Sequence, residues 1–245
     1  MWVTAFGVLG AIIGSFLATI AIRWSQGRSV KYGRSACDGC TRTLRASELV
    51  PLVSWLVTRG RCRTCGARID PLHPLIEAGC ALVGMAAALV APPPIALAGA
   101  AFGWLLLLLA VMDARDFWLP DPLVAALAVV AAAGAWVAPP AWDERLIGGA
   151  GGFATLWLIG AGYRRWRGRE GLGGGDPKLF GAIGVALGWR MLPAVLLVAG
   201  LVGLGWVVFQ RLRGRAVAAD DALPLGTLLA IAAYPAWLLM IGMAA

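Results

Sequence analysis

Two aspartates, Asp113 and Asp176, lie at the ends of strongly apolar segments of this chain. Asp113 closes one run, in Val-Met-Asp-Ala-Arg-Asp, and Asp176 opens another, in Gly-Gly-Gly-Asp-Pro-Lys-Leu. A carboxylate beside a membrane span carries a large free-energy cost of desolvation, so each aspartate is a candidate functional residue. Two neighbouring carboxylates cannot both ionise easily, so one keeps a proton while the other acts as a base on bound water. The pair therefore predicts hydrolysis of the aspartic-protease kind.

The surroundings of Asp176 fit this chemistry but leave a second interpretation open. The glycines at 173–175 would let a substrate backbone come close, because no side chain blocks it. Helix N-termini also favour carboxylates, so Asp176 and Asp121 are both candidate caps. We expect capping for Asp121, whereas spacing alone does not decide between capping and catalysis for Asp176. Asp116 is expected to be a solvated loop residue or a partner of Arg115.

Four cysteines form a second candidate site. They occur as two C-x2-C pairs separated by 21 residues, just beyond the spacing usual for four-cysteine zinc sites. Each pair can form a knuckle whose thiolates reach one metal, and four thiolates fill a tetrahedral shell, so we expect a structural zinc rather than a catalytic one. Reduced or transiently disulfide-bonded thiols are the alternative. The predicted ligands are Cys37, Cys40, Cys62 and Cys65.

The elements that must position these residues are membrane helices. Hydrophobic residues make up 60% of the chain and charged residues 14%, with a mean hydropathy of +0.79, whereas soluble domains are about half apolar and about a quarter charged. A span needs about 20 apolar residues, and the runs are continuous rather than alternating. We therefore expect an all-α polytopic membrane protein with about eight transmembrane helices, at 2–22, 74–91, 93–112, 119–138, 145–163, 177–189, 191–209 and 223–243.

The positive charges predict an orientation for these spans. With the N-terminus outside, 19 of the 21 Lys and Arg residues fall on the cytoplasmic side, and only Arg145 and Arg190 fall outside. Both Asp113 and Asp176 then lie at the cytoplasmic face. No basic stretch precedes the first apolar run, which favours an anchor over a cleaved signal peptide. The net charge of +8 is explained by lipid and topology, so we expect no nucleic acid partner.

The polar part of the chain is confined to one stretch. We divide the sequence into a first transmembrane helix (1–23), a small cytoplasmic four-cysteine segment (24–73) and a transmembrane bundle (74–245). A segment as small as 24–73 usually needs a metal or a disulfide to fold. The one histidine, His73, is expected to be structural or interfacial, and the fifth cysteine, Cys80, to be a small apolar helix residue.

Taken together, these motifs resemble the prepilin peptidases, or type IV leader peptidases. The resemblance covers nearly the whole chain in order, which makes the set specific although each motif is modest. It rests on Gly10–Leu17, the two cysteine pairs enclosing Pro51–Leu56 and Arg59–Cys62, His73–Glu77, Asp113 with Leu119-Pro120-Asp121, Gly173-Gly174-Gly175-Asp176-Pro177-Lys178-Leu179, and Leu223–Gly226.

The resemblance implies both residues and activities. By position, the catalytic pair is Asp113 and Asp176, because the spacing to Leu119-Pro120-Asp121 favours Asp113 over Asp116. The supporting motif would be Gly173, Gly174, Gly175, Lys178, Pro120 and Asp121. The implied substrate is a prepilin of type IV pili or a pseudopilin of type II secretion, cut at the cytoplasmic face of the bacterial inner membrane between a glycine and an apolar helix. Members with all four cysteines usually also methylate the new N-terminus with S-adenosylmethionine, so both activities are expected.

Three departures and two rival functions accompany this expectation. Ala18 stands where asparagine is common, His73 where tyrosine is usual and Val124 where threonine is usual; the first two bear on methylation more than on cleavage. A proton-coupled solute transporter would also use membrane aspartates, but it predicts a midplane site and often repeated halves. A non-enzymatic assembly scaffold would use the zinc segment for interaction and would process no prepilin.

Overall fold

The computed structural model describes residues 1–28, 35–215 and 222–244, and in these ranges the regular secondary structure is helical apart from two isolated β-bridges. Lys31 and Arg34, which contribute to the predicted charge asymmetry, lie outside the described residues. Each of the eight apolar runs coincides with a helix, so the all-α expectation is confirmed. The α-helices are α1 (Trp2–Ser25), α2 (Val53–Thr58), α3 (Leu72–Val90), α4 (Pro93–Asp116), α5 (Asp121–Ala133), α6 (Trp142–Arg167), α7 (Asp176–Leu187), α8 (Leu192–Leu212) and α9 (Leu225–Ala244), with 3-10 turns at Ala46–Glu48, Gly134–Trp136 and Trp189–Met191.

The helices differ in whether they are long enough to cross a bilayer. Among the described residues, six are both long and apolar enough, namely α1, α3, α4, α6, α8 and α9. The other two apolar runs form the shorter helices α5 and α7. The 12 residues of α7 rise only about 18 Å, against a hydrocarbon core of about 30 Å. Eight crossings therefore remain a prediction.

The chain forms two compact units, residues 1–89 and 90–245. In the first, α1 packs on α3 through glycines. A Cβ on Gly10 would collide with the backbone carbonyl of Cys80, and a Cβ on Gly14 would lie 2.8 Å from the Cα of Glu77. This close approach is the physical reason that α3 belongs with the N-terminal residues, whereas the sequence division assigned it to the bundle that follows.

The polar stretch of the first unit is organised by its cysteine knuckles. Each C-x2-C pair is enclosed by one antiparallel bridge, Ala36 with Thr43 and Arg61 with Arg68. The backbone of Leu52, at a positive φ of 60°, donates to Oε2 of the buried Glu77 at 2.7 Å. This carboxylate fastens the start of α2 to α3.

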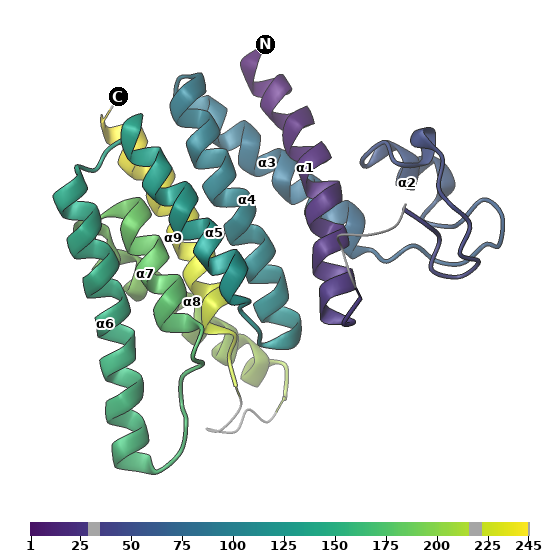
Figure 1. The fold of residues 1–245 in the computed structure, drawn as a ribbon. Coiled ribbons are helices and arrows are strands. Elements are labelled where there is room, and N and C mark those ends of the chain that lie inside the picture. The colour runs from purple at the N-terminus through teal and green to yellow at the C-terminus, as the bar shows by residue number, and fades with distance from the viewer. Residues whose placement is uncertain (29–34, 216–221, 245) are drawn as a thin grey trace. The chain divides into compact units, whose positions relative to one another are not determined.

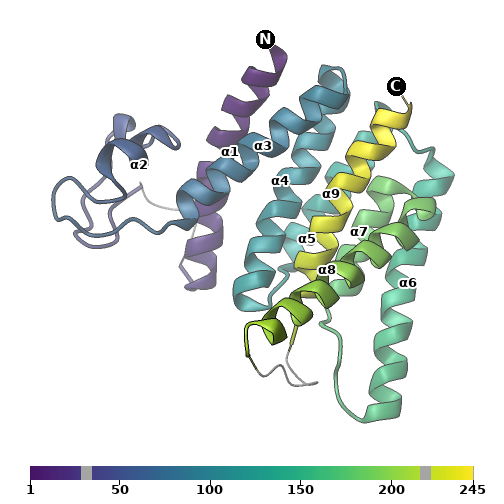
Figure 2. The same ribbon diagram turned by 180° about the vertical axis from the view of Figure 1, so that it is seen from behind.

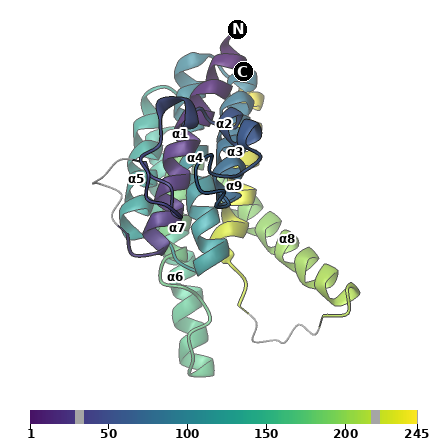
Figure 3. The ribbon, with the colours of Figure 1, turned by 90° about the vertical axis from the view of Figure 1, so that its right-hand side faces the viewer.

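The second unit is built around α7. Nearly all of α7 is buried, because α5, α6 and α9 pack against it (Figure 1). Behind it, α9 lies between α4 and α8 (Figure 2). Seen from the side, α6 and α8 diverge from one another toward their C-terminal ends (Figure 3). The N-terminus of α7, which carries Asp176, therefore lies inside the unit rather than on its surface.

Glycines set the spacing of α6 and α7. A Cβ on Gly148 would collide with the carbonyl of Gly184, and a Cβ on Gly184 would collide with that of Gly148. A Cβ on Gly152 would lie 2.8 Å from the carbonyl oxygen of Phe180. Because neither Gly148 nor Gly152 carries a side chain, α6 and α7 can approach one another closely.

Arg145, one of the two arginines that fall outside in the predicted topology, is buried with 2% of its surface exposed. It lies in the first turn of α6 and has no acidic partner among the described residues. Its guanidinium is satisfied by backbone carbonyls instead, which keeps five donors paired. Nε donates to Pro140 at 2.8 Å, Nη2 to Ala138 and Pro139 at 2.9 Å, and Nη1 to Ala131 at 3.0 Å and Val185 at 2.9 Å.

Candidate active site and metal centre

Asp113 lies in the last turn of α4 and is 5% exposed. Its Oδ2 accepts a hydrogen bond from the backbone N–H of Thr227 at 2.7 Å. The Thr227 hydroxyl is 3.1 Å from the same oxygen and 2.9 Å from the carbonyl oxygen of Ala110. Because Thr227 is the third residue of α9, the carboxylate of Asp113 lies at the N-terminal end of that helix, where the free backbone N–H groups and the positive end of the helix dipole favour negative charge.

Asp176 is the first residue of α7 and is 6% exposed. Its Oδ2 accepts from the backbone N–H of Gly173 at 3.0 Å. Its Oδ1 is buried and has no hydrogen-bond partner within the described ranges. The helix cap is Gly175, and no side-chain capping bond forms, so capping does not account for this carboxylate.

The structure brings the two aspartates together at Gly226. The backbone amide of Gly226 interacts with the carboxyl groups of both Asp113 and Asp176. A Cβ on Gly226 would lie 3.0 Å from Asp113 Oδ2 and 2.9 Å from Cδ1 of Leu119, and a Cβ on Gly175 would lie 2.7 Å from Cβ of Leu119. The loop before α5, the glycines before α7 and the start of α9 thus enclose one site.

The electrostatics of the site favour a retained proton. Asp176 lies outside the six helices long enough to cross a membrane. Burial and, to a smaller extent, the neighbouring Asp113 carboxylate raise the pKa of Asp176 to about 6. A carboxyl group with this pKa can hold a proton near neutral pH and donate it during a reaction.

The supporting residues expected from the sequence lie at the edge of this site. Asp121 is the first residue of α5, behind the buried cap residue Pro120, and it makes no capping bond. Its carboxylate instead accepts from Lys178 Nζ at 2.7 and 2.9 Å, with both side chains substantially exposed. The capping role expected for Asp121 is therefore wrong, because the cation on α7 competes for the carboxylate. Asp116 is exposed at the end of α4, as expected of a solvated residue.

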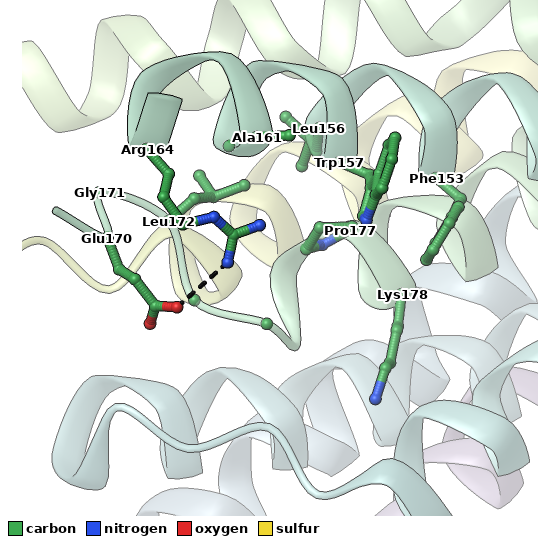
Figure 4. A pocket seen from close by; sticks show the side chains of 13 residues that line it. Phe153, Leu156, Trp157, Ala161, Arg164, Glu170, Gly171, Leu172, Pro177 and Lys178 are labelled. Atoms are coloured by element: carbon green, nitrogen blue, oxygen red, sulfur yellow. Dashed lines mark hydrogen bonds and ion pairs between the residues drawn. The ribbon is translucent and has the colours of Figure 1, made fainter. Parts of the chain in front are cut away.

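A cavity of about 350 Å³ lies beside the loop that leads to Asp176. Figure 4 shows Phe153, Leu156 and Trp157 of α6 on one side and Leu172 and Pro177 on the other. Gly173 and Gly174 also line it. The ion pair between Arg164 and Glu170, at 3.2 Å, closes one end. The cavity is therefore mostly apolar and adjoins the immediate neighbours of Asp176.

The four predicted zinc ligands converge in the first unit. Their Sγ atoms all lie within 4.8 Å of one another, and Cys37 Sγ is 3.7 Å from Cys65 Sγ. Zinc–sulfur bonds of about 2.3 Å in a tetrahedron place sulfurs about 3.8 Å apart, so the donor set fits zinc. The backbone N–H groups of Cys65 and Thr64 lower the pKa of Cys62 to about 6, whereas burial and the neighbouring thiols raise the pKa of Cys65 to about 11.

An ion pair lies beside this centre, where Arg42 also interacts with Cys62. Arg42 donates to both carboxylate oxygens of Glu48, at 3.0 and 2.7 Å. Together with the backbone N–H of Arg45, this pair lowers the pKa of Glu48 to about 2. Away from the centre, Cys80 is buried in α3 as an apolar residue would be, and His73 lies half-buried in the first turn of that helix.

Two site residues were not predicted from the sequence. Thr227 follows Leu223–Gly226, and a helix start after a proline could have indicated free amides there, but no pattern links it to Asp113, which is 114 residues away. Leu119 belongs to a quoted motif, yet only the structure shows it wedged between Gly175 and Gly226.

Comparison with known proteins gives two family matches and several relatives that align over most of their length. Residues 8–91 match the bacterial Peptidase A24 N-terminal domain, and residues 100–208 match the type IV leader peptidase family. A prepilin leader peptidase/N-methyltransferase of Dickeya chrysanthemi is 35% identical, with 86% of this chain and 84% of the relative aligned. Proteins of the same name from Pectobacterium carotovorum subsp. carotovorum and Burkholderia pseudomallei (strain K96243) are each 34% identical, covering 83% and 91% of this chain and 81% of each relative. No solved structure gives a significant match.

Proposed function

Because the chain belongs to the type IV leader peptidase family, we propose that it removes the leader peptides of prepilins with Asp113 and Asp176 as its reacting pair. The family expected from the order of the motifs is confirmed by these relatives. The observation that carries the catalytic assignment is the convergence of two buried carboxyl groups on the Gly226 amide, with Asp176 Oδ1 left without a partner.

The hydrogen bonds support different roles for the two groups. Asp113 receives the Thr227 amide and lies beside its hydroxyl, and donors to a carboxylate favour its ionised form. Asp176, whose pKa is raised to about 6, is the better proton carrier. Asp113 thus takes a proton from water as the water oxygen attacks the scissile carbonyl carbon. Asp176 then gives its proton to the leaving amine as the C–N bond breaks, and the proton on Asp113 restores Asp176.

Substitution of either aspartate by asparagine tests the assignment. Asp113→Asn and Asp176→Asn keep the side-chain shape but cannot transfer these protons, so cleavage of a prepilin by full-length protein in detergent should be lost. Loss of such groups typically costs about 10⁴-fold or more. Asp116→Asn is the matched control, since that carboxylate is exposed nearby, and it should cleave normally. Full cleavage by Asp113→Asn or Asp176→Asn would refute the pair.

We further propose that the chain methylates the new N-terminus, with S-adenosylmethionine supplying the methyl group. The names of the relatives, which carry both activities, support this. We assign the methylation to the unit 1–89, which contains the cysteine centre, and we propose that zinc occupies this centre as a structural ion. Four thiolates complete the shell of zinc, so the ion holds the knuckles and leaves no position for a reactant.

The chain is a multi-pass inner-membrane protein, and we propose that both sites face the cytoplasm. The support is the distribution of positive charges, which places 19 of the 21 Lys and Arg residues on one side when all eight predicted spans cross the membrane. Green fluorescent protein fused after Gly168 should then fluoresce, whereas alkaline phosphatase fused there should be inactive. The substrates would be prepilins or pseudopilins. Transport of a solute without any cleavage, or binding of prepilin without processing, would favour the rival functions.

A further inference from the structure

We propose that the cavity between α6 and the loop before Asp176 receives the large apolar side chain of the substrate residue that follows the scissile bond. This inference rests on the proposed peptidase function and adds a specificity site to it. The cavity is formed by Leu156, Trp157 and Phe153 on α6, and by Leu172 and Pro177 across from them (Figure 4).

The position of the cavity relative to the carboxyl groups is the first argument. Gly173 and Gly174 line the cavity, and Pro177 lines it from the residue directly after Asp176. Gly173 also donates its amide to Asp176 Oδ2. The cavity and the reacting carboxyl therefore adjoin the same short stretch of backbone.

The backbone geometry of an extended substrate supplies the second argument. A Cβ on Gly174 would meet nothing within 4 Å, so another chain can approach this stretch closely. Successive side chains of an extended chain point to opposite sides, about 3.3 Å apart along it. A substrate lying along residues 173–174 can thus present its scissile carbonyl to the aspartates and the next side chain to the cavity.

The charges around the cavity select the class of side chain. Its charged members are Arg164, Glu170 and Lys178; Arg164 pairs with Glu170, and Lys178 pairs with Asp121. A basic leader would find no unpaired carboxylate here. By contrast, Phe153 and Trp157 are 42% and 52% exposed within the chain, so an apolar occupant of the cavity can pack against aromatic surface.

The size of the cavity is sufficient for one large side chain. About 350 Å³ lies at the lower end of the range for small-molecule pockets, roughly 300–1,000 Å³. Filling such a pocket by a few carbon atoms typically changes kcat/KM by about 10- to 200-fold for a substrate that must enter it.

The test is to fill the cavity and vary the substrate. Ala161 lines the cavity, and Ala161→Phe should fill it. Full-length protein in detergent is given two prepilins that differ only after the scissile bond, one with phenylalanine and one with alanine. The variant should lose about tenfold or more in kcat/KM for the phenylalanine substrate while retaining most of its rate on the alanine substrate. Ile159→Phe adds the same ring to an exposed position of α6 outside the cavity and should behave as wild type.

Trp157→Ala provides an independent variant if Ala161→Phe fails to fold. It enlarges the cavity, so it should favour a substrate with tryptophan after the scissile bond relative to wild type. Equal losses on all substrates by these variants would overturn the inference and indicate a structural or lipid-filled cavity, and unchanged rates would also overturn it. The proposed function fails separately, if the wild-type protein cleaves neither prepilin.

Discussion

The two units hold their reactive groups by opposite means. In residues 90–245, Asp113 and Asp176 are 5% and 6% exposed, and helix ends contributed by α4, α7 and α9 hold them. In residues 1–89, the four predicted ligands Cys37, Cys40, Cys62 and Cys65 are at least partly exposed and stand on short loops, each closed by a single bridge. The difference indicates that packing fixes the carboxyl pair, whereas the ligands must fix the cysteine knuckles.

The largest expected effect is that loss of the metal abolishes the activity of one unit and leaves that of the other. The double variant Cys62→Ser/Cys65→Ser leaves only two thiolates, so the knuckles should lose their metal and fold, and methylation should be abolished. Prepilin cleavage should persist, because every described contact of Asp113 and Asp176 lies within residues 90–245. Metal content by mass spectrometry, cleavage by gel shift and the mass of the mature N-terminus measure the three effects. Parallel loss of cleavage and methylation would show that packing alone does not sustain the carboxyl pair.

The second-largest effect should come from adding one methyl group at Gly226, beside Asp113. A Cβ on Gly226 would lie 3.0 Å from Asp113 Oδ2 and 2.9 Å from Leu119 Cδ1, so Gly226→Ala must displace the carboxylate or the loop before α5. We expect kcat for cleavage to fall by about 100-fold, since small misplacements carry such costs, while methylation of an already cleaved pilin stays normal. Gly205→Ala is the control, because a Cβ there meets nothing within 4 Å.

Loss of one hydroxyl should have a smaller effect on the same carboxylate. Thr227→Val keeps the shape and the backbone N–H but removes the hydroxyl 3.1 Å from Asp113 Oδ2. A hydrogen bond to a charged group contributes about 1.5–3 kcal/mol, so we expect kcat to fall by about tenfold with KM little changed. Thr227→Ser should restore most of the rate. An equal loss in both variants would assign Thr227 a packing role instead.

The smallest expected effect is a pH-dependent gain in stability. The folded-state pKa of Asp176, about 6, lies above its ordinary value of 3.8, so the folded protein binds this proton more tightly than the unfolded chain does. The resulting stabilisation is complete below about pH 4 and is lost as pH rises through 6. Asp176→Asn removes the buried charge, and it should raise the melting temperature at pH 8 by several degrees, since a rise in pKa from 3.8 to about 6 corresponds to a few kcal/mol. The two proteins should melt alike near pH 4; a gain independent of pH would contradict the assignment.

The sequence predicts best those parts of the two sites whose geometry depends on residues that are adjacent in the chain. The cysteine pairs and the glycines before Asp176 carry their geometry in a few adjacent residues, so their spacing was informative. Thr227 contacts Asp113 only through the packing of α9 on α4, and Arg145 finds acceptors on α7 that lie 40 residues along the chain. The capping expected of Asp121 is wrong for a similar reason, because its partner Lys178 lies 57 residues away along the chain. Contacts of this kind depend on tertiary packing, which spacing does not encode.

Arg145 also bears on how the protein enters the membrane during synthesis. A bare guanidinium is costly to move across a bilayer. Here the hairpin of α5 and α6 supplies most of the acceptors itself, from Ala131, Ala138, Pro139 and Pro140. The hairpin can therefore insert with its charge already solvated, before α7 leaves the ribosome. The carbonyl of Val185 then accepts a hydrogen bond from the guanidinium of Arg145, which is already held by the α5–α6 hairpin. This bond fixes the position of α7, and with it Asp176, relative to the hairpin.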